Sequence, residues 1–288
     1  MTARQDCGKF RTNLQDAFYT KPDVAARCVE LLLGGCEVAH AADAVWLEPA
    51  AGAGAFLGAF PAGCTRFALD IAPAPAPAAA AIEHADFMTW EVPAEAGGKP
   101  LIVCGNPPFG RQGSAARAFI GRAAALGAAV IAFILPRSFM KPSMQTAFSA
   151  MYHCVVSEEL PVDSFTVNGE SHAVPCVFQV WERRAVPRVV ETAVRECGFA
   201  YVKAGAGTAW DIAVRRVGVN AGRAVVAQAG AAQPSVQSHY FIKLDAAANA
   251  AAAAAQLTAH TFPTNTTGPR SISKGELNAV LNDIIASL

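Results

Sequence analysis

The sequence lacks any arrangement of cysteines that is typical of a metal site or a disulfide framework. Its eight cysteines are irregularly spaced, and no two of them form a Cys-x-x-Cys pair. In a chain of 288 residues this pattern indicates reduced, mostly buried thiols. We therefore expect no metal ion, and we expect the chain to work in a reducing, cytoplasmic compartment.

An excess of charge of one sign and a long apolar run are also missing. Lys and Arg number 23, as do Asp and Glu, so the net charge favours neither an acidic nor a basic partner. The alanine-rich run 246–255 is interrupted and only weakly apolar, and no other stretch is typical of a transmembrane span. The segment Met1–Asp6 has no apolar core of a signal peptide. We expect no contact with a membrane.

The apolar residues that are present, 53% of the chain, are enough to bury a core. Strand candidates alternate with helix candidates, which predicts a parallel α/β sheet. The strand candidates are 44–47, 66–71, 101–104 and 129–135, and the helix candidates are 24–33 and 115–126. Two further apolar segments, 162–167 and 174–181, flank Asn168-Gly169 and predict a hairpin whose connection is longer than two residues.

The pattern changes after Arg184. Short strand candidates follow at 209–217, 223–227 and 239–244, and a last helix begins near Ser273. From residue 185 onward there are nine Lys or Arg and six Asp or Glu, a small excess of positive charge. We predict two parts, 1–185 and 186–288.

The most informative segment is Asn106-Pro107-Pro108-Phe109, which follows the apolar run 101–104. The two prolines stiffen the turn and have no N–H for a strand ladder. The Asn106 amide oxygen and the Pro107 carbonyl then form a rigid acceptor pair at the end of the strand. Such a pair suits the two hydrogens of a planar amine, and Phe109 can stack on the group that carries it. A proline-rich turn without function is the alternative.

A second segment, Glu48-Pro49-Ala50-Ala51-Gly52-Ala53-Gly54-Ala55-Phe56, follows the strand 44–47. Gly52 and Gly54 permit a tight turn and a close approach of the backbone to a ligand. The segment has no Gly-Lys-Ser/Thr, so it is no phosphate-binding P-loop. Leu57 stands where a dinucleotide fingerprint needs its third glycine.

These two segments resemble those of class I amino-methyltransferases, which use S-adenosylmethionine (SAM), and their order resembles γ-type N6-adenine DNA methyltransferases. Phe18-Tyr19-Thr20-Lys21-Pro22 is similar to the turn before the first helix of that family, although Lys21 is inserted between Thr20 and Pro22. The resemblance covers about residues 13–184. It implies a Rossmann-like seven-stranded sheet, mostly parallel with an antiparallel hairpin strand. The C-terminal α+β region would then be an accessory or target-recognition part.

The resemblance also implies SAM as the cofactor and assigns residues to it. Tyr19 and Thr20 would cover its methionine end, Glu48 would meet its amino group, and Asp70 would accept from both ribose hydroxyls. Asp86 would read the adenine amine beside Phe87, although a solvated turn aspartate would look the same. The remaining implied contacts are Pro49, Ala50, Gly52, Gly54, Phe56, Ile71 and Asn106.

Four residues are candidates for contact with the substrate. Arg137 and Lys141 follow the apolar segment 129–135, and Arg111 follows Phe109, so all three are placed to meet phosphates. Phe165 begins the expected hairpin and would either flank the target ring or pack in the core. Arg215-Arg216 is either a solvated pair or a phosphate clamp.

The sequence thus predicts a SAM-dependent N6-adenine methyltransferase that acts on nucleic acid, DNA rather than RNA. In this hypothesis Asn106, Pro107, Pro108 and Phe109 are catalytic, no metal takes part, and the protein is cytoplasmic or nucleoid-associated. The same chemistry on ribosomal or transfer RNA is one alternative. Methylation of a protein glutamine amide is another, although that family usually has Tyr where this chain has Phe109. A non-catalytic nucleic-acid-binding subunit is the third.

Overall fold

The computed structural model describes residues 18–72, 81–167, 169–190, 194–203, 208–246, 249–264 and 270–288. Residues 13–17, where the resemblance begins, and Asn168 of the expected turn lie outside these ranges. The chain divides into two compact units, Met1–Val190 and Glu191–Leu288. The boundary lies five residues beyond the one expected after residue 185.

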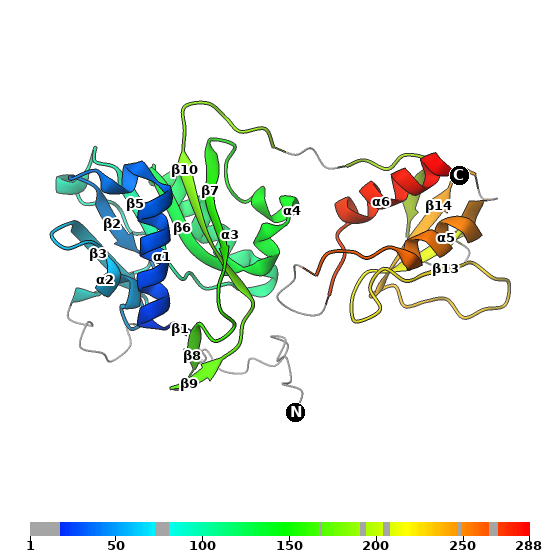
Figure 1. The fold of residues 1–288 in the computed structure, drawn as a ribbon, viewed down its shortest axis with the longest axis horizontal. Coiled ribbons are helices and arrows are strands. Elements are labelled where there is room, and N and C mark those ends of the chain that lie inside the picture. The colour runs from blue at the N-terminus through cyan, green and yellow to red at the C-terminus, as the bar shows by residue number, and fades with distance from the viewer. Residues whose placement is uncertain are drawn as a thin grey trace. The chain divides into compact units, whose positions relative to one another are not determined.

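The first unit is built on a seven-stranded sheet (Figure 1). In spatial order its strands are β4 (Glu83–His84), β3 (Thr65–Asp70), β2 (Val45–Glu48), β5 (Leu101–Gly105), β6 (Val130–Pro136), β10 (Cys176–Arg183) and β7 (Tyr152–Glu159). The pairs from β4 to β6 are parallel, and β10 runs antiparallel to both of its neighbours. This architecture agrees with the Rossmann-like seven-stranded sheet that the resemblance implied, mostly parallel with an antiparallel strand.

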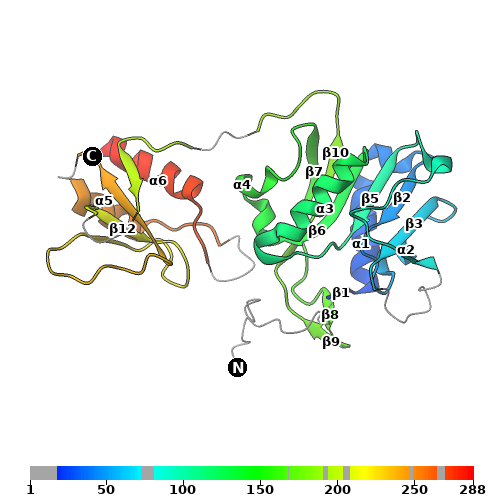
Figure 2. The ribbon, with the colours of Figure 1, turned by 180° about the vertical axis from the view of Figure 1, so that it is seen from behind.

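Helices cover both faces of this sheet. They are α1 (Pro22–Gly35) and α2 (Ala55–Ala59) on the face toward the viewer in Figure 1, and α3 (Ser114–Ala125) on the face toward the viewer in Figure 2. Because side chains alternate along a strand, Trp46 of β2 packs in the core under α1, while Val45 and Leu47 pack in the core under α3. Shorter turns of helix are η1 (Glu37–His40), η3 (Ala94–Ala96), η4 (Arg111–Gly113), η5 (Arg137–Met140) and α4 (Pro142–Gln145).

A separate three-stranded sheet joins the start of the first unit to its hairpin. Its strands are β1 (Tyr19–Thr20), β8 (Phe165–Val167) and β9 (Glu170–His172). Val167 pairs with Glu170, so two residues connect the strands, and the expectation of a longer connection was wrong. The hairpin partner is β9, whereas the apolar segment 174–181 forms most of β10 in the large sheet.

The second unit is a four-stranded antiparallel sheet with two helices. Its strands, in spatial order, are β11 (Phe199–Val202), β14 (His239–Leu244), β12 (Ile212–Arg215) and β13 (Ala224–Val226). The helices are α5 (Ala250–Ala259) and α6 (Lys274–Ser287), and Ser273 caps α6 through a capping box with Glu276. The unit has its own apolar core, which includes Ile212, Ile242 and Leu281. Among the helices of the described residues, none has the length and apolar character to cross a bilayer.

Candidate active site

The segment that begins at Asn106 leaves the C-terminal end of β5, at the centre of the large sheet. Pro107 is buried, Pro108 is exposed, and Phe109 is half-buried against the core under α1. The Phe109 carbonyl accepts hydrogen bonds from the N–H groups of Ala115 (3.2 Å) and Ala116 (3.3 Å) at the start of α3. These bonds fix the segment at both ends, between a buried strand and a helix.

The side chain of Asn106 is held on one side only. Its Nδ2 donates to the carbonyl of Phe18 at 3.3 Å, while its Oδ1 is buried and has no hydrogen-bond partner among the described residues. A buried acceptor without a donor costs about 1–3 kcal/mol. The amide therefore offers an oriented oxygen that a donor from a ligand would satisfy.

The loop after Phe109 holds an unusual backbone. Gly110 has φ +67°, and a Cβ there would lie 2.8 Å from the Ala115 nitrogen, so only glycine fits. Gln112 has φ +54°, a rare conformation for a residue with a side chain. This strain arises where the turn must reach α3, and no local sequence pattern predicts it.

The Gly-rich turn lies beside Asn106, because β2 and β5 are neighbours. A Cβ on Gly105 would lie 3.4 Å from both the Glu48 Cγ and the Pro49 Cδ. The Gly52 N–H donates to Asp70 Oδ2 at 2.7 Å, and Gly52 has φ +54°. A Cβ on Gly52 would lie 3.0 Å from the ring of Tyr19, so the tyrosine packs on the turn.

Glu48 is the most perturbed carboxyl of the site. It is buried, and its Oε2 accepts from the Leu57 N–H at 2.7 Å, within α2. Desolvation by burial raises the pKa of Glu48 to about 8. The backbone hydrogen bonds from Leu57 and Phe56 lower this pKa, and the negative charge of Asp70 raises it slightly further. Glu48 thus holds the Gly-rich turn against α2, and its contact with an amino group of the cofactor stays a prediction.

Asp70 ends β3 with both carboxylate oxygens engaged by backbone. In addition to Gly52, the Ala72 N–H donates to Asp70 Oδ1 at 2.7 Å. Each oxygen keeps a further lone pair, so Asp70 can also accept from hydroxyl groups. The next side chain, Ile71, is 69% exposed, which leaves an apolar face beside the carboxylate.

Asp86 and Phe87 follow β4 and occupy different environments. Asp86 is exposed, and its Oδ1 accepts from the Met88 N–H at 2.9 Å. Phe87 is 1% exposed and packs on Phe119 with ring centroids 5.1 Å apart. The structure differs here from the prediction, because the ring of Phe87 belongs to the core under α3 and has no free face for adenine.

Three other predicted residues also lie in the interior. Phe56 packs in the core under α1, and its contribution to the turn is its backbone N–H. Phe165 packs in the same core, edge-on to Phe18, so of its two alternatives the core position is confirmed. Lys141 is buried after η5, so the expectation that it meets phosphates does not fit its position. The cause is the same in each case: neighbours distant in sequence cover the side chain.

Two predicted cations remain at or near the surface. Arg111 is exposed in η4, directly after the loop of Phe109. Arg137 pairs with Glu159 at 2.8 Å, so its charge is already balanced.

Pro49 is buried and Ala50 is half-buried in the Gly-rich turn. Within the described residues no group of three His, Cys, Asp or Glu is placed to hold a metal.

A cavity of about 420 Å³ adjoins the Gly-rich turn. Its walls come from the turn before α1, the Gly-rich turn with α2, and β8, and they are Tyr19, Thr20, Lys21, Pro22, Ala26, Ala53, Gly54, Ala55, Gly58, Ala59 and Thr166. Reasoning from the sequence missed Lys21 and Thr166 as wall residues, because the pairing of β1 with β8 that places them leaves no mark on the sequence.

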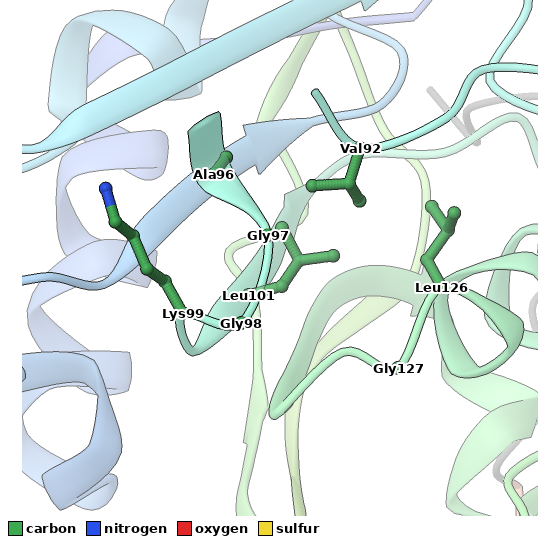
Figure 3. Close-up of a pocket in the computed structure, with 8 residues that line it drawn as sticks. All are labelled: Val92, Ala96, Gly97, Gly98, Lys99, Leu101, Leu126 and Gly127. Carbon is green, nitrogen blue, oxygen red and sulfur yellow. The ribbon is translucent and has the colours of Figure 1, made fainter. Parts of the chain in front are cut away.

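A second hollow, of about 320 Å³, lies at the opposite end of β5 (Figure 3). It is lined by Val92, Ala96, Gly97, Gly98, Lys99, Leu101, Leu126 and Gly127. Open α/β sheets bind ligands at the C-terminal ends of their strands. The end that carries Asn106, Asp70 and the Gly-rich turn is therefore the candidate site.

The residues at that end fit SAM. The carboxylate of Asp70 can accept from hydroxyl groups, the exposed Ile71 offers an apolar face, and the glycines of the turn permit a close approach of the ligand to the backbone. Tyr19, packed on Gly52, closes the turn on one side.

Comparison with solved structures gives weak likenesses. A protein from Pyrococcus horikoshii assigned as an RNA methyltransferase shares 13% identity over 59% of this chain and 88% of its own, with a TM-score of 0.45. The methyltransferase subunit of a type I restriction-modification system from Streptococcus thermophilus shares 16% over 58% and 45%, with a TM-score of 0.39. A Burkholderia thailandensis 1,6-didemethyltoxoflavin N1-methyltransferase, bound to S-adenosylhomocysteine, shares 13% over 57% and 78%, with a TM-score of 0.38.

All three TM-scores lie below 0.5. No curated protein matches the chain significantly. Residues 63–187 match the family model of the EDM2 methyltransferase-like domain. That range contains Asp70, Asp86 and Asn106–Phe109, and it holds strands β3 to β10 of the large sheet. This part of the first unit is therefore similar to a methyltransferase-like domain.

Proposed function

We propose that this protein transfers a methyl group from SAM to the exocyclic N6 amine of adenine in nucleic acid, DNA in preference to RNA. The observation that carries the proposal is the buried Oδ1 of Asn106, which has no donor among the described residues and is fixed by the Phe18 carbonyl. The match of residues 63–187 to a methyltransferase-like domain supports the reaction class.

The proposed chemistry needs acceptors and no strong base. The lone pair of an aromatic amine is delocalised into its ring, so the nitrogen is a poor nucleophile. Asn106 Oδ1 and the Pro107 carbonyl accept the two amine hydrogens, which concentrates electron density on nitrogen. When bound, SAM would supply the methyl group: the N–C bond would form as the sulfonium S–C bond breaks, S-adenosylhomocysteine would leave, and the methylated nitrogen would lose one proton to water. Because the acceptors are held rigidly by β5 and the two prolines, little reorganisation is needed at the moment of transfer.

The target ring is held by stacking. Phe109 is half-buried, so part of its ring stays available to a flat base. Stacking of a base on an aromatic side chain is worth roughly 1–3 kcal/mol. An adenine within a duplex cannot reach a pocket at the end of a buried strand, so the base is flipped out or single-stranded.

The second unit is proposed to contact the nucleic acid, although not through Arg215 and Arg216. Arg216 donates to the Gln237 carbonyl at 2.9 Å and lies 5.5 Å from the ring centre of Tyr240, while Arg215 donates to a backbone carbonyl. Both therefore stabilise the unit itself. Among the described residues of this unit, the exposed cations left for phosphates are Arg195, Lys203, Arg223 and Lys274, of which Lys274 lies 4.1 Å from the Tyr201 ring centre.

The experiment is a substrate panel with tritiated SAM. The full chain is incubated with duplex DNA, single-stranded DNA, structured RNA and a glutamine-containing protein, and the labelled products are hydrolysed and identified. Label in N6-methyldeoxyadenosine supports the proposal, and label in N6-methyladenosine supports RNA instead. Label only in glutamine, or none with SAM bound, contradicts it.

A further inference from the structure

The loop between Phe109 and α3 presents two exposed side chains beside the candidate site. It consists of Gly110, Arg111, Gln112 and Gly113, and it directly follows the ring that is proposed to stack on the target base. The side chains of Arg111 and Gln112 are exposed, and neither makes a hydrogen bond or an ion pair with another described residue. Three residues of chain span at most about 11 Å, so Gln112 lies close to Phe109.

The backbone of the Gly110–Gly113 loop is held in place by its neighbours. The Gly113 N–H donates to the Gly110 carbonyl at 3.3 Å, which closes the turn. A Cβ on Gly113 would lie 3.0 Å from the buried ring of Phe139 and 3.2 Å from the Met144 Cε, so the loop packs closely on these two side chains. The loop therefore presents its exposed side chains from a backbone that has little freedom.

Gln112 occupies a backbone conformation that is costly for a residue with a side chain. Its φ is +54°, and every other described residue with a positive φ is a glycine. A glycine would adopt this conformation without steric cost, whereas a glutamine stores strain in the folded state. Residues with such strain cluster at binding and catalytic sites, where the strain is part of the mechanism. The conformation of Gln112 therefore points to a use of the side chain itself.

The amide of Gln112 matches the base that a flipped adenine leaves behind. In duplex DNA that base is thymine, whose pairing edge carries one N–H donor between two carbonyl acceptors. The Gln112 Oε1 can accept from this N–H, and its Nε2 can donate to one of the carbonyls. Arg111 has donors only, so it cannot replace the adenine in this way, but it can contact a phosphate beside the gap.

We propose that Gln112 enters the gap left by the flipped adenine and pairs with the orphaned thymine, while Arg111 holds an adjacent phosphate. This inference rests on the proposed function, and it specifies duplex DNA as the substrate. A base that leaves the stack costs unpairing and unstacking energy, and the contact of Gln112 with thymine offsets part of that cost. Gln112 touches the opposite strand and not the reacting amine, so its contribution is confined to duplex substrates.

The test compares two forms of the same DNA on variants of the full chain. A circular single-stranded DNA and its fully double-stranded form are methylated with tritiated SAM at subsaturating DNA concentrations. Gln112→Ala should lower the rate on the duplex about 5- to 150-fold, the value of one good pair of hydrogen bonds to a base. The rate on the single strand should change little, because no orphaned base is present.

Gln112→Gly separates the side chain from the backbone conformation. Glycine adopts the positive φ without strain, so this variant should have a higher melting temperature than Gln112→Ala. It should nevertheless lose as much activity on the duplex as Gln112→Ala, because both variants lack the amide. A merely structural role of Gln112 predicts the opposite, that Gln112→Gly keeps the activity of the wild type.

Arg111→Met tests the contact with phosphate. It should weaken the binding of duplex DNA and reduce the salt dependence of binding by about one phosphate. Lys99→Met removes an exposed cation at the opposite end of β5, in the hollow of Figure 3, and should change neither quantity. Equal effects of the two substitutions would overturn the role of Arg111.

The remaining outcomes distinguish this inference from the proposed function. Full activity of Gln112→Gly on the duplex, or an equal loss on both forms of DNA, overturns the role of Gln112 while methylation of DNA by the wild type preserves the proposed function. A wild type that methylates the single strand but not the duplex also overturns this inference alone. A wild type that methylates neither form overturns both.

Discussion

Replacement of Asp70 tests how the site holds the cofactor. The carboxylate has one observed and one predicted function: it accepts from the Gly52 and Ala72 N–H groups at 2.7 Å each, and we predict that its remaining lone pairs accept from the ribose hydroxyls of SAM. Asp70→Ala removes both functions. Asp70→Asn keeps one acceptor oxygen, so it keeps one backbone bond and loses the negative charge.

The magnitude follows from these bonds. Hydrogen bonds to a charged group contribute about 1.5–3 kcal/mol each, so loss of one net bond to the ribose weakens SAM roughly 10- to 150-fold. Asp70→Ala should reach the upper part of this range, because the Gly52 turn also loses its anchor. Asp70→Asn should lie between Asp70→Ala and the wild type.

Titration calorimetry with SAM measures the dissociation constants, and melting temperatures show that the variants fold. Asp43→Ala is the matched control, since this carboxylate is exposed and precedes β2, at the opposite end of the sheet. Unchanged affinity in a folded Asp70→Ala would refute the reasoning. An equal loss in Asp43→Ala and Asp70→Ala would show that the effect is not specific to the site.

Two predictions concern stability. The pKa of Glu48 is raised from 4.5 to about 8, so the folded state favours its neutral form, and stability present below pH 4.5 is lost as pH rises through about 8. The free energy of unfolding of Glu48→Gln should therefore exceed that of the wild type at pH 8 by on the order of a few kcal/mol, and the difference should be smaller at pH 4.5. Chemical denaturation measures both values, and the same dependence on pH in the two proteins would contradict this prediction. A 1–190 fragment should fold and bind SAM, whereas a 1–185 fragment should melt at least several degrees lower, because it lacks Arg188. The Arg188 side chain donates to the carbonyls of Gln145, Phe148 and Tyr152 at 2.9–3.0 Å, and it lies 5.1 Å from the Trp181 ring centre. Equal melting temperatures for the two fragments would show that Arg188 does not stabilise the first unit.

The sequence predicted the parts of the fold that have local signals. The strands β2, β3, β5 and β6 are short apolar segments with clear turns, and each lies within two residues of its predicted place. The strand β7 (Tyr152–Glu159) was missed, because it lies at the sheet edge and only Tyr152 is fully buried. The strand β11 (Phe199–Val202), an apolar segment of four residues, was missed as well.

In the candidate site, the position of polar residues at strand ends could be predicted from the sequence, whereas the burial of aromatic rings could not. Asn106 and Asp70 stand where a strand ends, and the topology brings such positions together. Whether a ring is buried depends on packing partners far along the chain, as Phe119 shows for Phe87. The contact of Asn106 with the Phe18 carbonyl spans 88 residues and depends on the small sheet formed by β1 and the hairpin.

The central claim is that Asn106 acts on the target amine and not on the cofactor. We predict that Asn106→Ala loses roughly 10²- to 10³-fold in the rate of N6-methyladenine formation, the value of one preorganised polar partner, while its dissociation constant for SAM changes little. Asn220→Ala, an exposed asparagine of the second unit, should leave both quantities unchanged. Mass spectrometry of hydrolysed DNA and calorimetry with SAM measure the two quantities on the same samples. Full N6-methyladenine formation by Asn106→Ala would contradict the account.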